Sequence, residues 1–179
     1  MRFRYGVVAV LAVLSVASFA FQGGFRRFRG MEDNPAPMPA DAHEKTEFTF
    51  ARLMYSSGRW GWGYRGSWPT DYPKADRQFV QGVRRLTRIH TRSVEQVVDL
   101  DSDEIFNHPW IYAVEVGHWN LNDAHVRKLR EYLLRGGFLM CDDFHGAYEW
   151  DVFMASMSRV FPDRPVVEIE NADAIFSVL

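Results

Sequence analysis

The residues best suited to chemistry in this sequence form the run Asp142-Asp143-Phe144-His145. Two carboxylates beside an imidazole can hold a hard divalent cation. The same side chains can serve as a general acid and base, because one carboxylate raises the pKa of its neighbour. A structural interpretation is also open, in which Asp142 accepts backbone N–H bonds in the following turn while Asp143 and His145 are solvated. Residue types alone do not separate these three interpretations.

A second pair of candidates lies at the end of the apolar run Trp110 to Val116. Glu115 interrupts this run, and a buried carboxylate is costly unless it is paired. A partner such as Arg52, a ligand, or a half-exposed position at the strand end would each account for it. His118 follows a glycine turn and is a candidate base or ligand, with a capped surface histidine as the alternative. The candidate catalytic residues are therefore Asp142, Asp143, Glu115 and His118.

The segment Ser56 to Thr70 concentrates large aromatic residues among glycines and arginines. Exposed aromatic rings with hydrogen-bonding neighbours can stack on sugars or on a partner protein. The loop could instead fold back and bury its rings over the sheet edge, or act as a lid with glycine hinges. The candidate ligand-binding residues are Arg52, Trp60, Trp62, Trp68, Asp142, Asp143 and His145.

Several kinds of chemistry are disfavoured by the sequence. The single cysteine, Cys141, excludes an internal disulfide and a cysteine-cluster metal site. There is no phosphate-cradling glycine loop, no nucleophile elbow and no HExxH helix. His90, His108 and His125 have no convergent carboxylates and are expected at the surface. The net charge of −2 gives no electrostatic reason to expect nucleic acid.

The N-terminus carries a basic head and then an uncharged apolar run from Tyr5 to Phe21. This run fits a signal peptide, with small residues before Phe21, and at about 17 residues it also reaches the lower limit for a membrane anchor. We expect residues 1–21 to be a signal or anchor and residues 22–47, which hold three closely spaced prolines, to be a disordered linker. The protein is thus expected outside the cytoplasm, attached to the membrane if the segment is not cleaved.

Residues 48–179 alternate between strand and helix patterns. Strands are predicted at residues 48–55, 94–100, 110–116, 138–141 and 166–169, and helices at 73–88, 122–135 and 149–160. This alternation indicates an α/β domain, a three-layer sandwich around a mostly parallel sheet. Ligands bind such sheets beyond the carboxyl ends of the strands. Glu115 with His118, Asp142 to His145, and the loop 56–70 should all reach that edge.

Several stretches resemble the bacterial family catalogued as domain of unknown function 4159. They are FTFARLMY, WPTDYPKAD, HPWIYAVEVG, LREYLLRGGFLMCDDFHG and VFPDRPVVEI, between Phe48 and the end of the chain. The resemblance implies a fold similar to class I glutamine amidotransferases, a preceding signal or membrane segment, and no known activity. It also implies that the domain is C-terminally truncated. The amidotransferase cysteine would fall in the turn 115–118, which has neither cysteine nor serine.

These observations favour a non-catalytic domain of the cell envelope that binds a polar ligand, a glycan or a partner protein at the carboxyl edge of its sheet. A hydrolase using Asp142 and Asp143 with Glu115 and His118, with or without a divalent metal as cofactor, is the alternative. A structural subunit of the envelope is a third interpretation.

Overall fold

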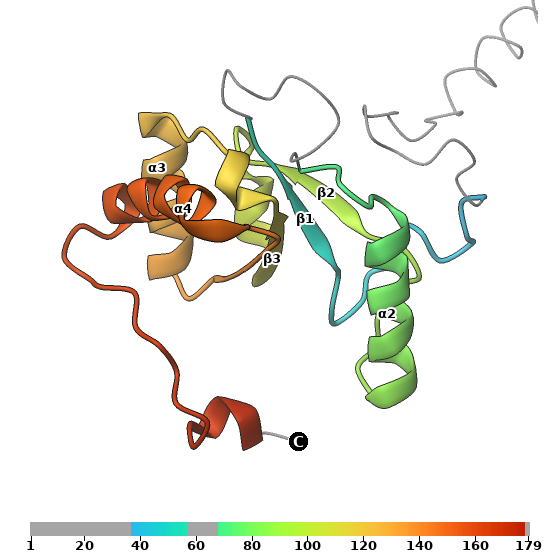
Figure 1. Ribbon diagram of the computed structural model, residues 1–179. Coiled ribbons are helices and arrows are strands. Elements are labelled where there is room, and N and C mark those ends of the chain that lie inside the picture. The colour runs from blue at the N-terminus through green and yellow to red at the C-terminus, as the bar shows by residue number, and fades with distance from the viewer. Residues whose placement is uncertain (1–36, 57–67, 178–179) are drawn as a thin grey trace, which may run out of the picture.

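The computed structural model describes residues 37–56 and 68–177. Its centre is a sheet whose strands lie in the order β2-β1-β3-β4 (Figure 1). All three neighbouring pairs are parallel, as the alternation of strands and helices predicts. The strands are β1 (Ala51–Met54), β2 (Gln96–Asp99), β3 (Trp110–Val114) and β4 (Phe138–Asp142).

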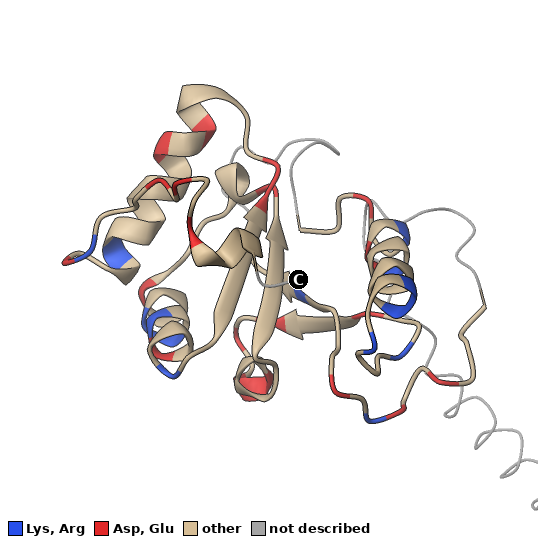
Figure 2. Cartoon of the chain, turned by 90° about the horizontal axis from the view of Figure 1, so that it is seen from below, with Lys and Arg blue, Asp and Glu red and all other residues tan. Residues whose placement is uncertain are grey.

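Helices cover both faces of this sheet (Figure 1), and Figure 2 shows the same arrangement from below. On one face lies α2 (Lys74–Leu86), and on the other lie α3 (Asp123–Leu134) and α4 (Gly146–Val160). Short 3₁₀ turns connect them at η1 (Asp103–Asn107) and η2 (Val116–His118), and a third, η3 (Ala174–Ser177), lies near the C-terminus. The prediction of an α/β domain is confirmed.

The apolar core fills the face covered by α3 and α4. Side chains alternate between the faces of a strand, so Ala51 and Leu53 of β1 point to this side together with Ile111 of β3. Leu129 of α3 and Val160 of α4 pack against them. All five are completely buried, and this face provides most of the hydrophobic stabilisation.

The opposite face is aromatic and carries a buried ion pair. Arg52 of β1 donates from Nε to Asp76 Oδ2 of α2 at 2.7 Å, and its Nη2 contacts Asp76 Oδ1. Its Nη1 donates to the carbonyl oxygens of Trp68 at 2.8 Å and Thr70 at 3.0 Å. The guanidinium also lies over the Tyr112 ring, 5.1 Å from its centroid. Burial raises the pKa of Asp76, and the hydrogen bonds from Arg52 oppose this shift.

Phe79, Val83 and Leu86 recur at helical spacing along α2, which predicts that they form its buried face, and this prediction is wrong. Phe79 is 44% exposed and Leu86 is 86% exposed. The buried residues of α2 are Asp76 and Val80, which lie four residues apart and therefore share one face. Because Asp76 must reach Arg52, the helix turns this face towards the sheet. Phe79 packs at the margin of this face, with its ring 5.2 Å from that of Phe50 and 5.8 Å from that of Trp110.

Two predictions about the C-terminal strands also need correction. The apolar run at residues 138–141 predicts a buried strand, but β4 alternates between exposed and half-buried residues, because within the described chain it pairs only with β3. The strand predicted at residues 166–169 does not form. Val166 and Val167 are exposed in a segment that leaves α4 and extends away from the sheet (Figure 1). Residues 166–169 pair with no strand of the described chain, so their apolar pattern alone does not produce a strand.

The predicted signal or anchor lies outside the described residues. None of the described helices has the length and hydrophobicity required to cross a bilayer. Within the predicted linker, Ala42 is buried, and Asp41 accepts hydrogen bonds from the backbone N–H of Ser93 at 2.9 Å and from its hydroxyl at 2.7 Å.

The Arg52–Asp76 pair gives a first stability prediction. Asp76→Ala leaves the buried guanidinium without its counter-charge and should reduce the free energy of unfolding by about 3–5 kcal/mol. Urea denaturation of the two proteins measures the difference. The control is Asp103→Ala, which removes a carboxylate that is 87% exposed and pairs with Lys128 at 3.1 Å, and which should change stability little. Equal effects of the two substitutions would contradict the proposed importance of the pair.

Candidate functional site

The structure fixes Glu115 at the carboxyl edge of the sheet. Glu115 directly follows β3 and adopts the left-handed conformation, with φ 55° and ψ 39°. Its N–H donates to the carbonyl oxygen of Asp142 on β4 at 2.9 Å. Its carbonyl oxygen accepts from the Tyr55 hydroxyl at 2.9 Å, at the end of β1. Three adjacent strands therefore position this residue, which is uncommon in this conformation for a non-glycine residue.

Glu115 belongs to a cluster with His118 and Glu149. His118 Nδ1 lies 3.3 Å from Glu115 Oε2, and His118 Nε2 lies 3.5 Å from Glu149 Oε1. The imidazole therefore lies between two carboxylates, one from the β3 end and one from α4. The three side chains are only partly accessible, with exposures of 14% for Glu115, 30% for His118 and 17% for Glu149. One ligand atom from each lies within 4.8 Å of the others.

A close approach between η2 and α4 places Glu149 in this cluster. A Cβ atom on Gly117 would lie 2.4 Å from the Glu149 Cβ, so only glycine fits at this contact. Glu149 Oε2 also accepts from the backbone N–H of His145, the N-cap residue of α4, at 2.6 Å. Glu149 thus fixes the start of α4 with one oxygen and faces His118 with the other.

Burial and neighbouring charge act together on Glu115. Burial is the largest cause of its raised pKa, and the carboxylates of Asp143 and Glu149 raise it further. His118 and His145 oppose the shift. The three carboxylates outnumber the two imidazoles, so repulsion between like charges remains. A bound cation would relieve this repulsion.

The predicted run Asp142 to His145 lies next to this cluster but forms no three-ligand group within the described residues. Asp142 Oδ1 accepts from the N–H of Asp143 at 2.9 Å, which confirms its predicted role in the turn. Asp143 has a φ of 53°, and its charge acts on Glu115. Metal binding by Asp142, Asp143 and His145 stays a prediction.

The remaining predicted site residues are three tryptophans and Arg52. Trp60 and Trp62 lie outside the described residues. Trp68 is buried, with its ring 5.9 Å from that of Tyr72, as the alternative of a folded-back loop predicts for this residue. The predicted pairing of Arg52 with Glu115 is wrong. The Arg52 guanidinium is bonded to Asp76 and to the carbonyl oxygens of Trp68 and Thr70.

Sequence reasoning missed Glu149 and misplaced His125. Glu149 lies in the first turn of the helix that follows β4, a position that faces the carboxyl edge of a parallel sheet, and this was the available signal. His125 was expected at the surface but is buried, with Nε2 2.7 Å from Asp101 Oδ1. Asn122 caps α3 by accepting from the His125 N–H at 2.9 Å, which fixes the turn that carries His125.

The fold and this cluster define a parallel α/β domain with a Glu-His-Glu group at the carboxyl edge of its sheet. Residues 49–179 match the model of the family described as domain of unknown function (DUF4159). Because this match covers most of the chain, the protein belongs to that family, and the resemblance seen in the sequence is confirmed at this level. No curated protein matches the chain.

The contact at Gly117 predicts a strong asymmetry between two glycines. Gly117→Ala should destabilise the protein by about 1–3 kcal/mol, because the added methyl group must displace Glu149 and the start of α4. The control is Gly82→Ala in α2, where nothing lies within 4 Å of the added Cβ. That substitution should stabilise by about 0.5–1 kcal/mol through helix propensity. Urea denaturation measures both, and a neutral effect of Gly117→Ala would contradict the close contact.

Cys141 should be chemically inert in the folded protein. Burial raises the pKa of its thiol to about 12, so the reactive thiolate is scarce at pH 8. We expect a thiol-specific chromogenic disulfide reagent to react slowly with native protein and rapidly in denaturant. Equal rates in the two states would show that the Cys141 thiol is accessible in the folded protein. Cys141 would then be a candidate nucleophile at the sheet edge.

Proposed function

We propose that this domain binds a divalent transition-metal ion through Glu115, His118 and Glu149, and that the ion helps to hold a polar ligand at the carboxyl edge of the sheet. The observation that carries this proposal is the convergence of three ligand atoms within 4.8 Å from two separate elements. One imidazole and two carboxylates suit Zn²⁺ or Mn²⁺ better than Ca²⁺, which takes six to eight oxygen ligands. Three protein ligands also leave a coordination position for a ligand.

The charge balance of the cluster supports a cation. Glu115 and Glu149 both face the His118 imidazole, and His145 is the second imidazole that acts on Glu115. Asp143 contributes further negative charge. A divalent ion would neutralise these groups and hold them at their present separation.

Ligand binding is favoured over covalent catalysis by the residue at the strand end. The sheet order and the helices on both faces support an amidotransferase-like fold, in which the nucleophile occupies a left-handed turn after a strand. Here Glu115 has this conformation, and Cys141 lies within β4 with a raised thiol pKa. A carboxylate in place of the thiol suits a metal or a polar ligand. The apolar N-terminal run supports a location in the cell envelope.

A metal-dependent hydrolase is the second candidate function. Burial raises the pKa of Glu115, which brings it closer to the range required of a general base, and His118 lies beside it. In that case Glu115, His118 and Glu149 would hold the ion, which would supply Lewis-acid chemistry, and a proton-accepting role for Glu115 would require it to leave the ion. Turnover of ester, amide or phosphoester substrates by metal-loaded protein would distinguish this candidate from ligand binding alone.

Titration calorimetry of chelator-treated full-length protein with ZnCl₂ and MnCl₂ tests the proposed site. We expect one ion per chain, with Glu149→Gln and His118→Gln each weakening binding at least about tenfold. Glutamine keeps an acceptor for the His145 N–H, so the helix start should survive. The control is Glu131→Gln on α3, an exposed carboxylate paired with Arg135. The proposal fails if the folded parent takes up no metal, or if both site variants bind like the parent.

A further inference from the structure

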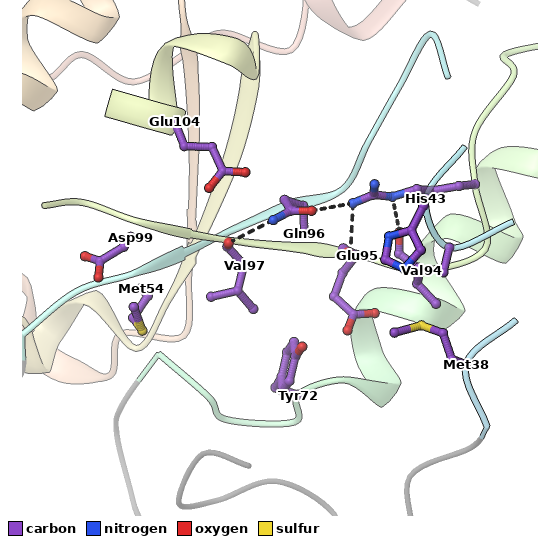
Figure 3. A pocket seen from close by; sticks show the side chains of 12 residues that line it. Met38, His43, Met54, Tyr72, Val94, Glu95, Gln96, Val97, Asp99 and Glu104 are labelled. Carbon is purple, nitrogen blue, oxygen red and sulfur yellow. Dashed lines mark hydrogen bonds between the residues drawn. The ribbon is translucent and has the colours of Figure 1, made fainter. Parts of the chain in front are cut away.

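A cavity of about 310 Å³ lies at the outer edge of β2, on the side of the sheet that faces α2. It shares no lining residue with the Glu115 cluster. Figure 3 shows its walls: Val97 and Asp99 of β2, Met54 of β1, and Tyr72. Its volume lies at the lower end of the range of ligand pockets in proteins.

Glu95 supplies this cavity with a buried acceptor that is not satisfied. Its side chain is 0% exposed, and Oε2 accepts from Arg77 Nε at 3.2 Å. The second oxygen, Oε1, accepts no hydrogen bond. Figure 3 shows the carboxylate pointing into the space between Tyr72 and Met38. A buried acceptor without a donor costs free energy, which a ligand N–H placed there would recover.

The charges around the cavity favour a cation. Asp99 and Glu104 are carboxylates in its wall, in addition to Glu95. The one arginine of the wall, Arg92, already donates to the carbonyl oxygens of Val94 at 3.1 Å and Glu95 at 3.2 Å. It also donates to Gln96 Oε1 at 2.9 Å. Its N–H groups are therefore bonded to the segment that leads into β2. Three carboxylates and this one arginine line the cavity.

The rest of the wall suits an aliphatic chain. Met38, Met54 and Val97 present flexible or branched apolar groups, and Tyr72 adds an aromatic ring. Methionine adapts to ligands of irregular shape. A carboxylate at one end of an apolar cavity selects a molecule with a positive head and an apolar body.

We propose that this cavity binds an organic cation in which an ammonium or guanidinium group is carried on a short aliphatic chain. The head donates an N–H bond to Glu95 Oε1, and the chain lies against Met54 and Val97. The head belongs either to a free amine or to an arginine or lysine side chain of a peptide. This site is independent of the proposed metal site.

Titration calorimetry of the full-length protein with agmatine tests the proposal. We expect one agmatine per chain, bound at least about tenfold more tightly than the neutral amide valeramide. Both can donate an N–H to Glu95, but only the cation makes a charge-assisted hydrogen bond to the carboxylate. Glu95→Gln should weaken agmatine at least about tenfold. This change also removes the counter-charge of Arg77, so Val97→Trp provides a second test that fills the cavity and keeps every carboxylate. Thermal melting establishes that each variant is folded.

Two controls separate this site from other charges. Asp103→Asn removes an exposed carboxylate outside the cavity, and Glu149→Gln removes a ligand of the metal site; both should bind agmatine like the parent. The capped peptide acetyl-Gly-Arg-Gly-amide identifies the source of the head group: tighter peptide binding indicates a protein side chain, and tighter agmatine binding indicates a free amine. The proposal is overturned if the folded parent binds no agmatine, if valeramide binds equally well, or if folded Glu95→Gln and Val97→Trp both bind like the parent.

Discussion

The buried ion pair between Arg52 and Asp76 is the contact on which the arrangement of α2 depends. Arg52 stands on the central strand β1, and its guanidinium holds the helix through Asp76 and the preceding loop through the carbonyl oxygens of Trp68 and Thr70. Since a buried guanidinium without a partner is costly, alternative positions of α2 are strongly disfavoured. Tyr72 is thereby brought over β2, where it forms a wall of the cavity beside Glu95.

The opposite end of β3 depends on backbone geometry rather than on charge. The left-handed conformation of Glu115 turns the chain sharply out of the sheet, and η2 brings His118 back over it. Tyr55 and the Asp142 backbone hold this turn from the neighbouring strands. A carboxylate thus occupies the strained position after the strand, where strain is commonly associated with function.

Much of the fold could be predicted from periodicity and capping signals. The Asn122 cap, the glycine end of α3 and the apolar run of β3 each specify their element locally. The buried face of α2 could not be predicted, because it depends on a long-range partner on β1. Glu115 and His118 were found because they are polar residues at a strand end. Glu149 was missed, because a glutamate in a first helical turn is ordinary until tertiary structure places it opposite a histidine.

The contact between Gly117 and Glu149 has a consequence for how sequences of this family can vary. The backbone of η2 lies so close to the side chain at position 149 that the two positions cannot change independently. A larger residue at position 117 would require α4 to shift and would separate Glu149 from His118. Relatives that keep the Glu-His-Glu group should therefore keep glycine at position 117. Relatives that lose one should be free to lose the other, so these positions should be inherited as a pair.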